Sequence, residues 1–305
     1  MAFINEIKSL KDQIKFDKRF DINYDFDNIV ISGMGGSGIA GRIFQECYTK
    51  KPVFSISDYD IPDFVNDRTL FIAMSYSGNT EETISTVEQA MKRNANIFAV
   101  TSGGKLASIV KDYIEIPGGM QPRSALGYMI MPLFNTFLDI SDDDKNNAYN
   151  TLNNMDQNHD DIRKEAYKIY ENSYMPVIYG SAPYSWVAYR WKTQFNENSK
   201  ILAYSNYFPE LNHNDTMALK NTYRKERFVF YVLGSSRPRI KQRINITKEI
   251  TDTEFNIIDI DSDNYLEKLF YLIHYGDYIS YELAMIRNID PMDVSTIEEL
   301  KKRLD

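Results

Sequence analysis

Residues 28–42 read Asn28-Ile29-Val30-Ile31-Ser32-Gly33-Met34-Gly35-Gly36-Ser37-Gly38-Ile39-Ala40-Gly41-Arg42. A short apolar run rich in β-branched residues ends at a glycine-rich turn, and a segment of helical character (39–48) follows. Glycines let the backbone take positive φ angles and let a ligand approach closely. A strand-to-helix turn of this kind points free backbone N–H groups and the helix dipole at one spot. The pattern predicts an anion-binding turn, most often for phosphate, formed by Gly35, Gly36 and Ser37.

The same turn also fits the fingerprint of dinucleotide-binding proteins. Its glycines follow the spacing Gly33-x-Gly35-x-x-Gly38, and Asp58 comes directly after the next apolar run, 53–57. An acid at the end of the second strand is the residue that would bind a ribose hydroxyl. A nicotinamide- or flavin-dependent oxidoreductase is therefore an alternative, and other parts of the sequence must distinguish between the two functions.

The composition is that of an ordinary globular protein. The 305 residues are 43% hydrophobic and 26% charged, and the net charge of -8 argues against a nucleic-acid or anionic-membrane partner. A single cysteine, Cys47, rules out an internal disulfide and fits a reducing interior, and three histidines without a Cys/His cluster make a zinc site unexpected. The amino-terminal segment does not read as a signal peptide, and the chain has no apolar run long enough to span a membrane. We expect a cytoplasmic protein.

Apolar runs of strand length alternate with helical segments, which predicts an α/β fold. In the first half these runs are 29–32, 53–57, 70–74, 97–101 and 113–116. The acidic, polar segment 139–147 then marks a domain boundary, which gives a first domain at 1–140 and a second at 141–305. The second half repeats the plan more loosely, with further strands at 176–179, 200–204, 228–233 and 255–260. Two doubly wound domains, each a parallel sheet flanked by helices, are expected. The strand–Gly–Ser–helix pattern at 177–184 is similar to that at 30–39 and favours a duplicated domain in which one copy kept the phosphate turn; the alternative is that any two α/β halves share this rhythm.

A second turn is crowded with hydroxyl groups. The strand at 70–74 runs into Ser75-Tyr76-Ser77-Gly78-Asn79-Thr80, and Thr83 follows. A plain helix cap explains one of these hydroxyls, that of Thr80, but not four of them. We expect Ser75, Ser77 and Thr80, together with Ser37, to hydrogen-bond one phosphate. Two anion-ready turns at the ends of parallel strands favour a small sugar phosphate over a dinucleotide.

Together the two turns are similar to the signature of the sugar isomerase (SIS) domain. More closely, the chain resembles the two-SIS-domain family of bifunctional phosphoglucose/phosphomannose isomerases. The similarity covers nearly the whole chain and continues through 101–106, 122–128, 196–200, 210–214, 290–291 and 300–301. The resemblance implies two SIS-type domains that bind a sugar phosphate and interconvert an aldose phosphate with its ketose.

The resemblance also implies roles for four side chains. Glu197 would be the base that moves a proton between C2 and C1, and Arg123 would stabilise the enediolate. His213 and Lys301 would assist ring opening, with His213 reaching the active site of the partner subunit in a homodimer. No metal or other cofactor is implied. On the residues alone, Glu197 can also be read as a solvated helix-end acid and Arg123 as a salt-bridged residue at a helix entry.

Use of mannose 6-phosphate is the less secure part of the resemblance. In the family it goes with a threonine shortly before the carboxy-terminal lysine. Val294 occupies that place here, although Thr296 is close by. An alternative to an enzyme is a sugar-phosphate-binding regulator that keeps both phosphate turns but needs neither Glu197 nor His213.

Overall fold

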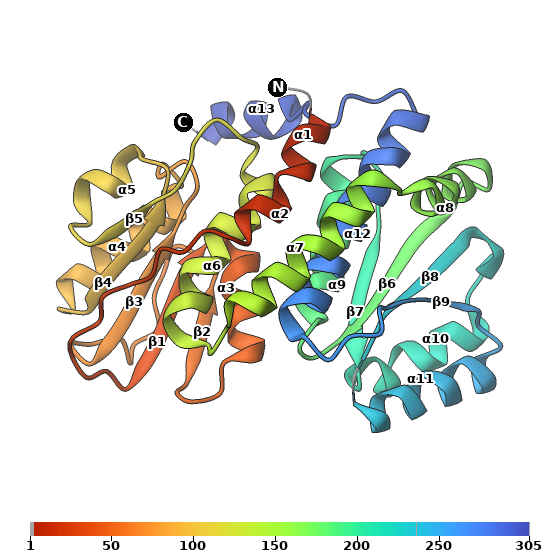
Figure 1. Cartoon of the computed structure of the whole chain (residues 1–305), viewed down its shortest axis with the longest axis horizontal. Helices are drawn as coiled ribbons and strands as arrows, with labels where there is room; N and C mark the ends of the chain where they lie inside the picture. Colours follow the sequence, from red (N-terminus) through yellow and green to blue (C-terminus); the bar gives the residue numbers. More distant parts are fainter. Residues whose placement is uncertain (1–2, 236, 305) are drawn as a thin grey trace. The chain divides into compact units, whose positions relative to one another are not determined.

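The computed structural model describes residues 3–235 and 237–304 and contains two all-parallel sheets flanked by helices (Figure 1). The chain forms two compact units, one holding residues 8–153 and 264–267 and the other holding the remaining described residues. We predict the domain boundary in the acidic segment 139–147. Helix α7 (Asp142–Gln157) begins inside this segment, and the two units divide within the helix, between Asn153 and Asn154. The α/β class with two parallel sheets is thus confirmed.

The first sheet has the strand order β2-β1-β3-β4-β5. Its strands lie close to the predicted runs: β1 (Asn28–Gly33), β2 (Val53–Ile56), β3 (Thr69–Met74), β4 (Asn96–Thr101) and β5 (Tyr113–Glu115). This is the flavodoxin-like order of doubly wound folds, in which the chain switches direction between β1 and β3. Ligands of such folds bind at the carboxyl ends of the strands beside that switch.

Helices cover both faces of this sheet. On one face, Val30 of β1 and Phe71 of β3 share a buried cluster with helix α4 (Glu81–Lys92). On the other face lies α3 (Gly35–Cys47). It approaches the sheet so closely that a Cβ on Gly41 would lie 2.8 Å from the side chain of Ile31. The remaining helical segments of this unit are α2 (Leu10–Gln13), α5 (Gly104–Ile109), η1 (Pro122–Ala125) and α6 (Leu126–Phe137). Helix α1 (Phe3–Lys8) belongs to the other unit, except for Lys8.

Helix α3 begins earlier than predicted. We expected a helix from residue 39, but its first turn is formed by the glycines themselves, starting at Gly35. A Cβ on Gly38 would lie only 2.4 Å from the carbonyl oxygen of Gly33, so the helix can start this close to the strand only because residue 38 has no side chain.

The second sheet has the order β7-β6-β8-β9, which repeats the order β2-β1-β3-β4 of the first. Its strands are β6 (Met175–Ser181), β7 (Tyr204–Phe208), β8 (Phe228–Leu233) and β9 (Phe255–Ile258). The flanking segments are α8 (Asp160–Glu171), α9 (Ser185–Glu197), η2 (Glu210–His213), α10 (Asp215–Asn221), η3 (Lys225–Arg227), α11 (Pro238–Thr251) and α12 (Tyr265–Ile286). The strand predicted at 200–204 lies instead at Tyr204–Phe208, because α9 continues to Glu197 and residues 198–203 form its cap and a loop.

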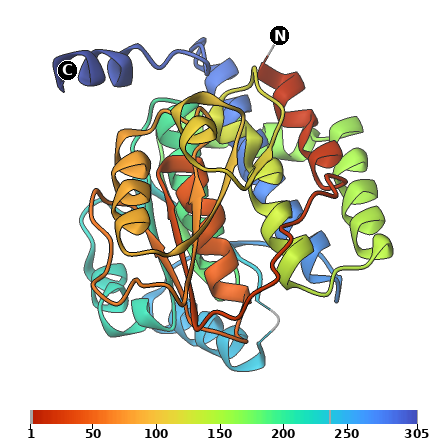
Figure 2. The same cartoon turned by 90° about the vertical axis from the view of Figure 1, so that its left-hand side faces the viewer.

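The described chain ends in α13 (Ser295–Leu304), which buries none of its side chains. Figures 1 and 2 both show this helix joined to the end of α12 by an extended segment. No helix within the described residues combines the length and the apolar character needed to cross a bilayer.

Candidate functional site

Strands β1 and β3 are paired in a register that brings the two predicted phosphate turns together. Gly33, the last residue of β1, lies opposite Met74, the last residue of β3. The glycine-rich turn and the hydroxyl-rich turn therefore leave the sheet at the same height, on adjacent strands, at the switch point of the fold.

The glycine-rich turn presents backbone N–H groups. Gly35 has a φ angle of +52°, and Met34, which precedes the helix, makes no side-chain cap. The N–H groups of Gly35, Gly36 and Ser37 belong to the first turn of α3, where no carbonyl of the helix can accept from them. The positive end of the helix dipole lies at the same place. Ser37 is buried, at 6% exposure, next to these groups.

The hydroxyl-rich turn is held by its own side chains. The Oγ of Ser75 lies 2.8 Å from the Oγ1 of Thr80 and accepts from the N–H of Gly78 at 3.1 Å. Ser77 is exposed, and its Oγ accepts from the N–H of Asn79 at 3.2 Å. Thr80 occupies the N-cap position of α4, but its side chain makes no cap hydrogen bond, so a plain cap does not account for its hydroxyl. The Thr80 hydroxyl instead fixes Ser75.

A third turn, after β4, supports the second one. The N–H of Leu106 donates to the carbonyl of Gly78 at 2.8 Å, and the N–H of Lys105 donates to the Oδ1 of Asn79 at 2.9 Å. A Cβ on Gly78 would lie 1.8 Å from the carbonyl oxygen of Gly103. The glycine pair Gly103-Gly104, which follows β4, is the sequence signal for this contact. We did not predict from it that this turn supports the neighbouring one.

Arg123 lies against the glycine-rich turn. A Cβ on Gly36 would be 3.2 Å from the carbonyl oxygen of Pro122 and 3.3 Å from the Cα of Arg123. The Arg123 side chain is buried, with 4% exposure, and its guanidinium donates to the Oε1 of Gln121 at 3.1 Å. The first unit thus collects both predicted phosphate turns and the predicted enediolate-stabilising cation.

Two buried side chains that sequence reasoning missed position this arginine. Gln13 is fully buried; its amide donates to the carbonyl of Ser124 at 2.8 Å and accepts from the N–H of Gly127 at 2.9 Å. The hydroxyl of Tyr76 accepts from the N–H of Met120 at 2.9 Å. Both contacts join residues far apart in the chain, and no local sequence signal predicts them.

Glu197, in the other unit, is the last residue of α9 and is half-buried. The asparagines beside it fix the backbone. Asn196 donates to the carbonyl of Ile201 at 2.7 Å, and the fully buried Asn198 donates to the Oγ of Ser280 on α12 at 2.9 Å. The end of α9 is therefore held rigidly around the carboxylate-bearing residue.

His213 is exposed at the end of η2, in the loop that follows β7. Its neighbours anchor this loop. Asn212 donates to the Oγ1 of Thr247 at 2.8 Å and accepts from Arg243 at 3.2 Å, while the Oδ1 of Asn214 caps α10 through the N–H of Asp215 at 2.6 Å. The loop thus presents the imidazole on an anchored backbone.

Lys301 is exposed on α13. The segment leading to this helix is tied to the end of α9, because the ammonium group of Lys200 donates to the carbonyl of Asp293 at 2.6 Å and also to the carbonyl of Glu197. The carbonyl of Val294 accepts from the N–H groups of Ile297 and Glu298, at 2.9 and 3.0 Å, and Thr296 is exposed. The part of the chain that carries Lys301 thus begins beside Glu197.

Comparison with known proteins matches both halves of the chain. Residues 24–130 match the SIS domain, and residues 158–304 match the bacterial phospho-glucose isomerase C-terminal SIS domain. A bifunctional phosphoglucose/phosphomannose isomerase of Thermoplasma volcanium is 56% identical over 304 residues, and the match covers 100% of both proteins. The chain belongs to the bifunctional phosphoglucose/phosphomannose isomerase family. The predicted resemblance is therefore confirmed.

More distant similarity extends the same pattern. A family member from Aquifex aeolicus is 36% identical over 296 residues, and the match covers 92% of this chain and 91% of the relative. Glucosamine-6-phosphate deaminase from Thermotoga maritima has a similar fold, with a TM-score of 0.72 at 16% identity over 95% of this chain and 96% of that protein. At such low identity the likeness concerns the fold alone.

Proposed function

We propose that the protein interconverts glucose 6-phosphate, and also mannose 6-phosphate, with fructose 6-phosphate. The main support is the position of the two turns. They follow Gly33 and Met74, which are paired at the ends of adjacent strands, and Arg123 contacts the first turn. Family membership and the activity in the names of the relatives support the same reaction.

The phosphate of the sugar would bind between the two turns. Backbone N–H groups of Gly35 and Gly36 would donate to it, together with the hydroxyls of Ser37, Ser77 and Thr80, and Ser75 would hold Thr80 in place or donate directly. Neutral donors aimed at one point bind an anion well even in a chain whose net charge is -8.

The chemistry needs one base and one fixed cation. Glu197 would remove the proton from C2 and return it to C1, so that no net oxidation occurs. Arg123 would stabilise the negative charge of the enediolate, and its burial favours this role because a fixed cation in a dry site acts strongly on developing charge. His213 and Lys301 would open the sugar ring by exchanging protons with the ring oxygen and the C1 hydroxyl.

We further propose that the active form is a homodimer in which His213 serves the partner's active site. The exposure of His213 on an anchored loop supports this arrangement. A two-fold axis would then deliver one imidazole to each of two equal sites.

Two alternatives are disfavoured. A dinucleotide-dependent oxidoreductase of the common type would have the strand order 3-2-1-4-5-6, whereas β1 lies here between β2 and β3. Asp58, the predicted ribose ligand, accepts from the N–H of Tyr59 at 2.7 Å in a local turn. A non-catalytic regulator would not require the rigid presentation of Glu197 by Asn196 and Asn198.

The direct test is to incubate the full-length protein with fructose 6-phosphate and to measure both aldose phosphates. Formation of glucose 6-phosphate is expected. Formation of mannose 6-phosphate would establish the second activity, even though Val294 stands where the resemblance implies a threonine. Tight binding without conversion would support the regulator instead. A thermal shift with a nicotinamide cofactor, without conversion of the sugar, would support the oxidoreductase.

A further inference from the structure

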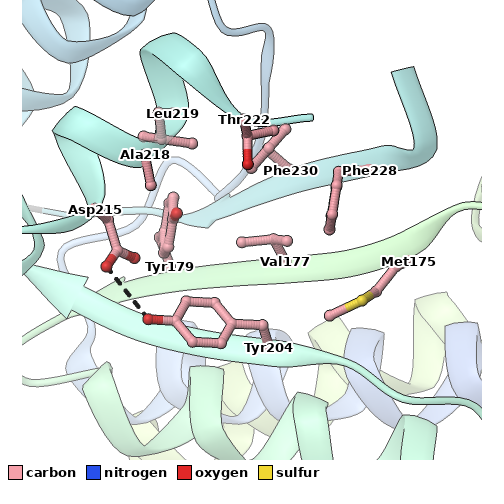
Figure 3. A pocket seen from close by; sticks show the side chains of 10 residues that line it. All are labelled: Met175, Val177, Tyr179, Tyr204, Asp215, Ala218, Leu219, Thr222, Phe228 and Phe230. Carbon is pink, nitrogen blue, oxygen red and sulfur yellow. Dashed lines mark hydrogen bonds between the residues drawn. The ribbon is translucent and has the colours of Figure 1, made fainter. Parts of the chain in front are cut away.

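A pocket of about 250 Å³ lies within the second unit, between α10 and the strands beneath it (Figure 3). Its floor is formed by Met175, Val177 and Tyr179, which share one face of β6 because side chains alternate along a strand. Phe228 and Phe230 of β8 continue this apolar floor. The pocket uses none of the side chains proposed above for isomerisation.

Helix α10 forms the opposite wall. Ala218 and Leu219 face the strands from the helix, and Asp215 at its start and Tyr204 of β7 close one end of the pocket (Figure 3). The lining is therefore mostly apolar, with the hydroxyl of Thr222 beside Phe230 and, at the end near Asp215, a carboxylate and phenol hydroxyls (Figure 3). Binding sites for small molecules commonly combine apolar walls with a few placed polar groups.

The carboxylate of Asp215 has capacity for a further donor. Its Oδ1 accepts from the hydroxyl of Tyr204 at 3.3 Å, and the hydroxyl of Tyr179 also interacts with the carboxylate, but among the described residues the buried Oδ2 has no partner at full hydrogen-bond geometry and no cation. No ion pair of Asp215 exists within the described part of the chain. A carboxylate can only accept hydrogen bonds, and leaving a buried oxygen without a donor is costly. A ligand that brings a positively charged donor would meet this demand.

The neighbouring phenols keep their protons beside this carboxylate. Burial and the charge of Asp215 raise the pKa of Tyr179 well above its usual value, and the same causes raise the pKa of Tyr204. Both rings therefore remain neutral at physiological pH. A cation near the carboxylate would also be attracted to the aromatic faces of the wall.

We propose that this pocket binds a small molecule with one protonated amine and an apolar body about the size of a phenyl ring. The amine would donate to Asp215, and the body would lie over Val177 and against the rings of Phe228 and Phe230, which contact each other with centroids 6.2 Å apart. The volume suits such a ligand, because a cavity of about 150 Å³ already takes up benzene. The proposal stands independently of the isomerase reaction.

The test is calorimetric titration of the full-length protein with 2-phenylethylamine and with its neutral analogue 2-phenylethanol. For ligands of this size a dissociation constant of roughly 0.1–1 mM is expected for the amine, and at least about tenfold weaker binding for the alcohol. Asp215→Asn keeps the shape of the side chain and removes its charge, so it should abolish the preference for the amine. Asp252→Asn, an exposed change in the same unit, controls for non-specific attraction to the acidic protein.

A second variant tests the location. Ala218→Phe places a large side chain at the mouth of the pocket from an exposed helix position and should abolish binding of both probes. Circular dichroism of each variant would establish that it is folded. Equal binding of amine and alcohol, or an amine preference that survives Asp215→Asn, would overturn the proposed ligand class. Binding that survives Ala218→Phe would overturn the site.

Discussion

Gly36 and Arg123 are in backbone contact: a Cβ on Gly36 would lie 3.3 Å from the Cα of Arg123. The absence of a side chain at residue 36 therefore sets how near the arginine stands to the phosphate turn. The first prediction follows from this distance. Gly36→Ala should push the backbone of η1 away by a few tenths of an ångström and lower kcat by about 10-fold or more, because small misplacements of catalytic groups are costly.

Gly118→Ala is the matched control for this change. Residue 118 lies in the segment that leads to Arg123, but its Cβ would meet only the side chain of Ser102, at an ordinary 3.7 Å. The control should retain nearly full activity. Steady-state kinetics with fructose 6-phosphate would compare the two variants, and equal activities would show that the Gly36 contact does not position Arg123.

The second prediction concerns phosphate binding. Ser77→Ala should chiefly raise KM and leave kcat nearly unchanged, since the phosphate is held equally in the ground state and the transition state. Ser108→Ala, an exposed serine on α5 whose hydroxyl donates to the carbonyl of Lys105, is the control and should not change KM. A fall in kcat at constant KM would assign Ser77 to the chemistry instead.

The third prediction separates binding from proton transfer. Glu197→Gln keeps the size of the side chain and removes the proton acceptor, and a positioned general base typically contributes about 10²–10⁴-fold to the rate. The variant should bind fructose 6-phosphate nearly normally and exchange the C2 proton with solvent at least about 100-fold more slowly. Solvent deuterium incorporation followed by NMR measures this exchange. Unchanged exchange would move the role of base to another residue.

The fourth prediction tests the assignment of His213 to the partner's site. His213→Ala and Glu197→Gln homodimers should each be nearly inactive. If His213 acts across the interface and Glu197 within its own chain, each mixed dimer holds one intact site and one site with both lesions. Mixing the two proteins under subunit exchange should then restore up to half of the wild-type activity per mixed dimer. Exchange without recovery would place His213 within its own chain's site or outside the mechanism.

The fifth prediction concerns the single cysteine. Burial raises the pKa of the Cys47 thiol to about 12, and its Sγ donates to the carbonyl of Phe44 at 3.3 Å. The thiolate is the reactive form, so the raised pKa alone should slow modification by a disulfide reagent at pH 8 by roughly 10³-fold relative to a free cysteine. The rate should rise steeply towards pH 12 and should be restored at pH 8 in denaturant. Fast reaction in the native protein would contradict the raised pKa of this half-buried thiol.

The first domain was readily predictable from the sequence. Strands such as β1 and β3 are buried on both faces, and a continuous apolar run between turns is their direct signature. The two turns that we propose for phosphate were equally visible, because their glycines and hydroxyls stand directly after strands. In contrast, nothing near Gln13 indicates that it holds the backbone of Ser124, since that contact joins segments more than a hundred residues apart.

The second domain was harder to predict for a related reason. The amides of Asn196 and Asn198 donate to the carbonyl of Ile201 and to the hydroxyl of Ser280, and so fix the end of a helix. A polar residue beside a catalytic one can line a pocket or fix the backbone, and the sequence does not distinguish the two. The short helix α10 was missed because its seven residues are too few to show a periodic pattern.

The pairing of Gly33 with Met74 restricts how chain length can change in this protein. Deleting one residue within β3 would lower its turn by about 3.3 Å relative to the neighbouring turn and would send every following side chain to the opposite face of the sheet. Insertions in the connection between β2 and β3, residues 57–68, would leave both strand ends in place. Length variation that preserves the phosphate site should therefore be confined to such connections, and indel scanning would reveal β1 and β3 as the least tolerant segments of the first domain.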